Sequence, residues 1–359
     1  MSDVLETVVR RTIEIAQVPA PTGAEAERAA VVRSWWERDG LREVDVDAVG
    51  NVWGQMRGGD GAAVILCAHL DTVFGAEVPH TVRIQGDTLV GPSVGDDSVG
   101  LASLSAAGMA LSARGVPVWL LATVGEEGLG NLCGVSAALD APPAPVAAFV
   151  AVEGNYLGRI STVGVGSVRR RVRVLGPGGH AWEAAESPSA VHMLGQLVAS
   201  IAAMPRRRGT SVNVGRIGGG EGINMRAREA WLELDLRAED PDALAAVTRE
   251  VEDLLERIDP PLAVDQDVLG DRPAGHVDPG HPLVRAATEA LTEVGTSSTS
   301  PATSTDANAA HARGIPAIAV GVTRGSGEHT AQEWIETAPI EDGVRVLART
   351  IERFEELRG

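Results

Sequence analysis

The strongest constraint on the fold is a run of six apolar residues, 63–68, that lies between glycine-rich turns. A run this short and uniformly apolar is typical of a strand buried on both faces by helices. Residues 116–124 and 146–152 form two more such runs, and a helical segment of small residues, about 98–114, precedes the first of them. Buried strands separated by helices predict an α/β fold with a mostly parallel sheet flanked by helices.

Other local patterns surround these strands. Residues 3–17 have helical periodicity, and a second helix is predicted from Thr22, with Glu25 three positions later as a capping box. Residues 81–91 predict a hairpin that turns at Gly86-Asp87. Short strands are expected near residues 44–46 and 51–56, and the Ser/Thr-rich stretch 295–305 is expected to be a loop.

The pattern changes near Thr162. Residues 168–175 alternate Arg and Val, which indicates a half-buried antiparallel strand. The elements from there to residue 268 follow the order β-α-β-β-α-β, which predicts a small α+β sandwich. The α/β pattern then resumes with helices at 281–294 and 340–357 around a strand at 315–321. We therefore expect a discontinuous first domain, residues 1–163 and 274–359, with an inserted domain at 164–273.

Composition excludes several functions. The 359 residues carry a formal net charge of −18, and all 31 basic residues are arginine, so nucleic-acid binding is not expected. Cys67 and Cys133 do not form a C-x-x-C pattern, which argues against a thiolate zinc site. The N-terminal segment lacks the apolar core of a signal peptide, and no run of about 18 apolar residues occurs, so we expect a cytoplasmic protein with no membrane partner.

Metal-ligating side chains follow the predicted strands. His69 and Asp71 come directly after the first buried run and share one face of an extended chain, so the Asp71 carboxylate can orient the imidazole. Glu126 and Glu127 follow the second run, and two adjacent carboxylates at the end of an apolar strand are costly unless charge compensates them, although they could also be a solvated pair in a loop. Glu153 follows the third run in the same way.

Two further residues complete a candidate metal site. Asp96, in a turn that opens a helix, can bridge two ions through its two oxygens, although a lone Asp there is more often an N-cap. His329 follows the strand at 315–321. Open α/β sheets bind small molecules and ions at the carboxyl ends of their strands, so these side chains should converge there. Imidazole and carboxylates suit zinc, and also cobalt or manganese, and a paired site lowers the pKa of a shared water.

The order of these motifs resembles a known family. The runs CAHLDTV, GPSVGDDSVG, TVGEEGLG, VEG, GPGGHA, GINMRAREAWLELDLR and GSGEHTAQEW cover nearly the whole chain. They are similar to the two-zinc metallopeptidase family that includes peptidase T, carboxypeptidase G, aminoacylase-1 and acetylornithine deacetylase. The GEEGLG run resembles the peptidase T branch most. His329 lies 176 residues after Glu153, which leaves room for the inserted domain.

The resemblance implies a role for each residue and two zinc ions per subunit. His69 and Glu153 would bind one ion, Glu127 and His329 would bind the other, and Asp96 would bridge them. Asp71 would orient His69. Glu126 would act as the general base toward water and later protonate the leaving amine.

The resemblance also implies a role for the inserted domain as a lid and as a homodimer contact. His180 would stabilise the oxyanion, in its own subunit's site or in the partner's. Asn224 and Arg237 match positions that hold substrate in relatives. Two departures lie near the substrate side: Ser98 stands where relatives often have Lys, and Arg226 where a proline is common.

The implied function is hydrolysis of a peptide or amide bond in a small substrate. An aminopeptidase and an N-acyl amino acid deacylase share this mechanism, and the sequence does not separate them. An inactive metal- or ligand-binding relative is a third hypothesis, but the intact Glu126-Glu127 pair argues against it. A nicotinamide-dependent dehydrogenase is disfavoured because Gly218-Gly219-Gly220 lacks a strand–GxGxxG–helix context, and a serine hydrolase because no G-x-S-x-G elbow occurs.

Overall fold

The chain folds into two compact units. The computed structural model describes residues 2–59, 61–111 and 115–358. One unit comprises Met1–Gly164 and His276–Gly359, and the other comprises Val165–Gly275. The last three positions of the helix predicted at 98–114 lie outside the described residues.

The first unit is built on a seven-stranded sheet in the order β1-β2-β6-β3-β7-β15-β8. The apolar runs form its parallel centre, β2 and β8 pair antiparallel to this centre, and β1 pairs antiparallel to β2. The predicted α/β class is therefore confirmed. The central strands are β6 (Val118–Thr123), β3 (Ala63–His69), β7 (Val146–Glu153) and β15 (Ala317–Gly321), and the edge strands are β1 (Arg42–Val46), β2 (Val52–Arg57) and β8 (Ile160–Ser161).

Helices bury both faces of this sheet, which explains why its central strands are apolar throughout. All seven residues of β3 are buried, with Val64 and Leu66 in one core cluster and Ile65 and Cys67 in another. The first cluster is completed by α1 (Asp3–Ala16), α2 (Ala26–Arg38), α3 (Gly100–Met109), α7 (Pro282–Glu293) and α9 (Ile340–Arg358), and the second by α4 (Cys133–Asp140) and α8 (Ala307–His311).

A small sheet in the same unit brings the chain back toward the carboxyl ends of the strands. The predicted hairpin is present as β4 (Arg83–Gln85) and β5 (Thr88–Val90). It is extended by β17 (Trp334–Glu336), which pairs with β5, and by β16 (Gly325–Ser326). The loop 327–333 between β16 and β17 carries His329.

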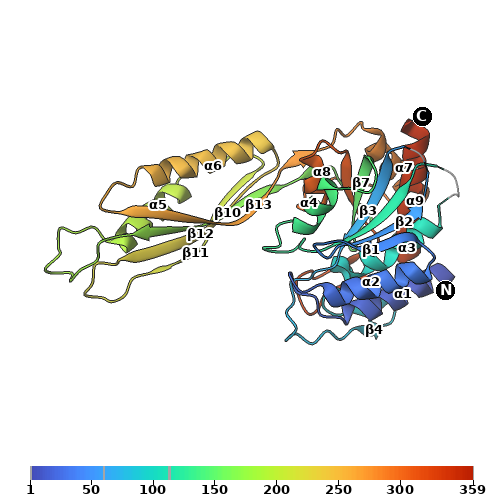
Figure 1. Ribbon diagram of the computed structural model, residues 1–359, viewed down its shortest axis with the longest axis horizontal. Coiled ribbons are helices and arrows are strands. Elements are labelled where there is room, and N and C mark those ends of the chain that lie inside the picture. The colour runs from blue at the N-terminus through green and yellow to red at the C-terminus, as the bar shows by residue number, and fades with distance from the viewer. Residues whose placement is uncertain (1, 60, 112–114, 359) are drawn as a thin grey trace. The chain divides into compact units, whose positions relative to one another are not determined.

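The second unit is a four-stranded antiparallel sheet in the order β11-β12-β10-β13, with two helices on one face (Figure 1). In β10 (Gly166–Leu175), Arg and Val alternate over residues 171–174, because Val172 and Val174 are buried against the helices while Arg171 and Arg173 lie on the other face. The remaining elements are α5 (Ala190–Ala202), β11 (Thr210–Gly219), β12 (Glu229–Ala238), α6 (Pro241–Glu256) and β13 (Ala263–Arg272). The chain passes between the units at β9 (Val163–Gly164) and β14 (Gly275–His276).

Some local expectations were wrong. The capping box at Thr22 does not form: α2 begins at Ala26, and Glu25 Oε1 accepts the N–H groups of Gly23 and Gly125 instead. Helices α4 and α8 were not predicted, because their alanine- and glycine-rich sequences show little amphipathic periodicity. In the described ranges, no helix is long and apolar enough to cross a bilayer.

His311 should make the stability of the first unit depend on pH. Burial, and then the charge of His276, lowers the pKa of His311 to about 4. An unfolded histidine titrates near pH 6.5, so between about pH 6.5 and 4 the unfolded chain binds a proton that the folded chain does not, and stability falls as the pH falls. With allowance for the exposed part of the ring, the loss by pH 4 is about 2 kcal/mol.

Thermal unfolding of the metal-free protein at pH 7, 5.5 and 4.5 measures this dependence. Between pH 7 and 4.5, the midpoint for His311→Asn should fall less than the wild-type midpoint. His192→Asn, at an exposed position in α5, is the control and should follow the wild type. Equal slopes for His311→Asn and wild type would show that His311 carries no such dependence.

Candidate metal centre

The carboxyl ends of the four parallel strands place the candidate ligands at one edge of the sheet. His69 and Glu153 are the last residues of β3 and β7, which are neighbours in the sheet. Glu126 and Glu127 follow β6, the other neighbour of β3. His329 lies in the loop after β16. Parallel pairing therefore brings together residues that are far apart in the chain.

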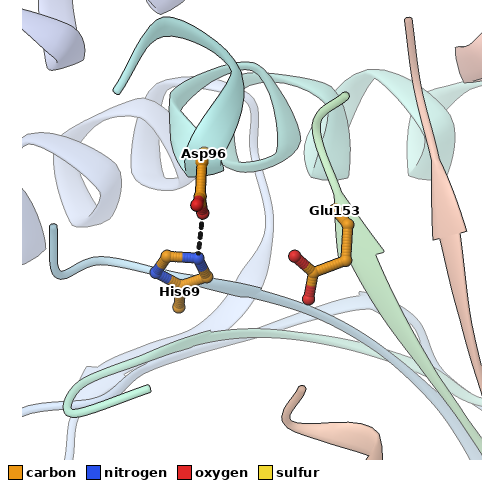
Figure 2. A group of neighbouring side chains, drawn as sticks. All are labelled: His69, Asp96 and Glu153. Atoms are coloured by element: carbon orange, nitrogen blue, oxygen red, sulfur yellow. Dashed lines mark hydrogen bonds and ion pairs between the residues drawn. The ribbon is translucent and has the colours of Figure 1, made fainter. Parts of the chain in front are cut away.

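Three side chains form the first potential metal-binding group: His69, Asp96 and Glu153, each with a ligand atom within 4.8 Å of the others. Figure 2 shows His69 at the end of β3 facing Asp96, with Glu153 directed toward the same space. The Nε2 atom of His69 lies 2.9 Å from Asp96 Oδ1. His69 is 2% exposed, and Asp96 and Glu153 are half-buried.

Asp96, Glu127 and His329 form a second group that shares Asp96 with the first. The Nε2 atom of His329 lies 3.2 Å from Asp96 Oδ2 and 3.1 Å from Glu127 Oε1. The two oxygens of Asp96 thus face different histidines. His69, Glu126 and Glu127 also satisfy the same distance criterion. The first two groups coincide with the ligand sets expected from the sequence, and the ligand roles themselves stay predictions.

Asp71 organises more than the histidine beside it. The Nδ1 atom of His69 is 2.9 Å from the main-chain oxygen of Asp71 and 3.5 Å from its Oδ1. The Asp71 carboxylate also accepts the N–H groups of Glu126 (3.0 Å) and Glu127 (2.8 Å) and the hydroxyl of Thr22 (2.8 Å). The sequence predicted contact with the imidazole, but neither the contacts to the Glu126-Glu127 loop nor the role of Thr22.

Asp97 joins the segment that carries Asp96 to the central strands. Its carboxylate accepts the N–H of His69 at 3.2 Å and the N–H of Gly154 at 2.8 Å. The segment itself, η1 (Val94–Val99), has wide helical turns, within which Asp96 and Asp97 adopt non-helical dihedral angles. Asp96 is therefore presented from a distorted turn rather than as the simple N-cap that its position suggested.

Acidic groups outnumber the positively charged groups at the site. Burial raises the pKa of Glu153 and of Asp97 well above the ordinary carboxyl range, and neighbouring carboxylates add to the shift of each. Hydrogen bonds to Asp96 and Glu127 raise the pKa of His329 to about 10. Burial alone would lower the pKa of His69, but its contacts with Asp71 and Asp96 outweigh that effect and raise it.

A cation would relieve this imbalance. Buried carboxylates that resist ionisation, beside histidines that hold protons to compensate them, are what a divalent ion would replace with its own charge. The donors are imidazole nitrogen and carboxylate oxygen, the set that zinc prefers and that cobalt and manganese also accept. The residues present therefore fit a pair of divalent metal ions that share Asp96.

Two buried charged residues near the site were missed at the sequence level. Arg28, fully buried in α2, donates to the main-chain oxygens of Val18 and Leu70 and to the Ser93 hydroxyl. Burial lowers its pKa to about 10, against the opposing charges of nearby carboxylates such as Asp71 and Asp97. Arg28 lies in a polar stretch and Glu333 in a loop, so no local pattern marks either residue as buried.

The predicted substrate residues lie in the second unit. His180 and Asn224 occupy adjacent exposed loops, joined by a hydrogen bond from the N–H of Ala181 to the Asn224 main-chain oxygen (2.8 Å). Arg237 is near the far end of β12 from the Asn224 loop, and its guanidinium contacts Asp235 at 3.0 Å. The structure therefore brings His180 and Asn224 together but does not bring Arg237 to them.

The chain is similar to a known protein family over most of its length. The model of peptidase family M20/M25/M40 matches residues 65–353. No curated protein sequence matches significantly.

Solved structures of the same fold include three bacterial peptidases. The aminopeptidase PepT from Bacillus cereus is 23% identical with a TM-score of 0.81, and 98% of each chain is covered. A tripeptidase from Staphylococcus aureus is 18% identical with a TM-score of 0.82, covering 98% of this chain and 99% of that one. The YXEP protein of Bacillus subtilis, a dinuclear metal-binding peptidase, is 17% identical with a TM-score of 0.74 and the same coverage.

Gly154 should be essential for bringing the two ligand-bearing segments together. A Cβ at this position would overlap the carbonyl oxygen of Gly95 and the Val99 side chain. Gly154→Ala must push the Glu153 loop away from Asp96, so we expect metal affinity to fall at least about tenfold and stability to fall by about 1–3 kcal/mol.

Calorimetric titration of the metal-free protein with zinc, together with thermal unfolding, measures both effects. Gly195→Ala in α5, where nothing lies within 4 Å of the added methyl group, is the matched control and should bind zinc as wild type does. Unchanged zinc affinity in Gly154→Ala would contradict the close-approach argument.

Proposed function

Because the chain belongs to peptidase family M20/M25/M40, we propose that it is a two-zinc hydrolase that cleaves small peptides. Because members of this family hydrolyse peptide or amide C–N bonds, the chain is a hydrolase of this class. The metal, its number of ions and the substrate are the proposed parts. One observation carries the paired metal site: Asp96 directs one carboxylate oxygen to His69 and the other to His329, at the centre of two potential ligand groups.

In this proposal each group holds one zinc ion. His69 and Glu153 would hold the first, Glu127 and His329 the second, and Asp96 would be common to both. When bound, a pair of divalent ions supplies Lewis acidity toward the scissile carbonyl and lowers the pKa of a water molecule to about 7. The protein's part is to fix these donors. It does so through buried carboxylates that accept hydrogen bonds from the main chain of the ligand-bearing segments and so orient the ligands.

Glu126 is proposed as the proton carrier. Its side chain is 7% exposed, and a carboxylate oxygen lies within 4.8 Å of ligand atoms of His69 and Glu127. Its main-chain N–H is fixed by Asp71, so the position of the residue is tied to the same carboxylate that faces His69. From there the carboxylate takes a proton from the attacking water and returns it to the nitrogen of the leaving amine.

Small peptides are the first proposed substrates. Two of the similar structures are an aminopeptidase and a tripeptidase, each aligned over nearly the full length of this chain. An N-acyl amino acid deacylase would use the same donors and the same proton carrier, and differs only in the group beside the scissile bond. The two substrate classes are therefore separated by assay.

The second unit is proposed to act on the substrate through His180 and Asn224. Both lie at one end of the unit beside the exposed apolar side chains of Trp182 and Ile223. A histidine and an asparagine can donate hydrogen bonds to an oxyanion or to a substrate carboxylate. A monomeric state in solution, measured by light scattering, would restrict them to the site of their own subunit.

Metal content should respond differently at Asp96 and at Glu153. We expect about two zinc ions per wild-type chain, about one in Glu153→Ala, and neither bound tightly in Asp96→Ala, because Asp96 belongs to both groups. Elemental analysis after dialysis measures the content, with Asp253→Ala on the exposed face of α6 as the control. One ion retained by both site variants would rule out a shared ligand.

Glu126→Gln should strongly reduce turnover without removing metal. The amide keeps the size of the side chain but cannot accept the proton from water, so kcat should fall about 10²- to 10⁴-fold. The assay uses di- and tripeptides and N-acyl amino acids at saturating zinc, and the metal content is measured in parallel. Wild-type turnover confined to N-acyl amino acids would replace the peptidase with a deacylase. Undiminished turnover in the variant would remove Glu126 from the mechanism.

A further inference from the structure

A carboxylate outside both ligand groups lies directly behind Asp96. Glu333 is fully buried at the end of the loop 327–333, immediately before β17. Its Oε1 atom accepts the N–H of Asp96 at 2.8 Å and the N–H of Gly95 at 3.0 Å. Asp96 has non-helical dihedral angles within η1, so Glu333 supplies an acceptor to an N–H that the helical pattern there cannot serve.

Asn155 extends this contact to the other ligand segments. Its side chain is 1% exposed, and its Nδ2 group donates to Glu333 Oε1 at 3.2 Å and to Glu328 Oε1 at 3.0 Å. Asn155 is two residues after Glu153, and Glu328 is adjacent to His329. The pair Glu333 and Asn155 therefore connects the segments that carry the shared ligand and one ligand of each group.

We propose that Glu333 and Asn155 are positioning residues that hold Asp96 between His69 and His329. This inference rests on the proposed two-metal function. Glu333 and Asp96 are distant in the sequence, and Glu333 is fully buried. Their hydrogen bond therefore joins two separate segments in the interior of the unit. Rotation of the Asp96 segment would break two main-chain hydrogen bonds to one buried oxygen, so the carboxylate of Asp96 is kept in the orientation that gives one oxygen to each histidine.

The contacts of Glu333 suggest a matched pair of substitutions. The Oε2 atom of Glu333 has no hydrogen-bond partner among the described residues, whereas Oε1 has three. Glutamine can therefore keep the acceptor at Oε1. Methionine has a similar length but no oxygen, so Glu333→Met removes the acceptor and retains most of the volume. Asn155→Leu removes the donor in the same way.

Cobalt binding to the metal-free protein tests the proposal without any assay of turnover. We expect Glu333→Met and Asn155→Leu to lower cobalt affinity by about 10- to 100-fold and to change the visible d–d spectrum of the bound ion. The reason is that the carboxylate of Asp96 would no longer be held in its orientation. Glu333→Gln should recover most of the affinity lost in Glu333→Met. With zinc and the best peptide, kcat should fall more than KM rises in the two damaging variants.

Several results would overturn the proposal. One is a Glu333→Met variant with a lowered melting temperature but a wild-type cobalt affinity and spectrum, which would make the role structural only. Another is a Glu333→Gln variant as impaired as Glu333→Met, which would exclude the acceptor as the cause. Should Glu333→Met fail to fold, Asn155→Leu decides. A wild-type chain that binds no cobalt would instead overturn the two-metal function itself.

Discussion

The structure depends on keeping several carboxylates together at the buried edge of a parallel sheet. Carboxylates in such a place are unstable as a group unless positive charge is supplied. The protein supplies part of that charge through the protonated forms of His69 and His329 and through the buried guanidinium of Arg28. The remaining need is what makes the site suited to divalent ions. The acids that create this need are Asp96, Asp97, Glu126, Glu127 and Glu153.

Three carboxylates that are not candidate metal ligands make the same kind of contact. Each accepts two main-chain N–H groups from segments that carry a candidate ligand: Asp71 from the Glu126-Glu127 loop, Asp97 from His69 and Gly154, and Glu333 from Gly95 and Asp96. A carboxylate that accepts two N–H groups fixes the backbone and therefore the direction of the side chains it carries. Ligand geometry is thus set by second-layer acids as much as by the strands.

The two units contribute in different ways. The first holds all of the candidate metal ligands, so the candidate metal site is formed within this unit alone. The second has a separate core and presents His180 and Asn224 from loops at one end of its sheet.

The sequence by itself determined the fold class and the candidate ligands. Apolar runs such as 63–68 favour buried strands, and the acids and histidines that follow them are then expected to meet at the carboxyl ends of those strands. Only the tertiary structure decided that Thr22 contacts Asp71, that Glu25 does not cap α2, and that Arg28 and Glu333 are buried at the site. These facts depend on contacts between distant segments, and local periodicity carries no information about such contacts.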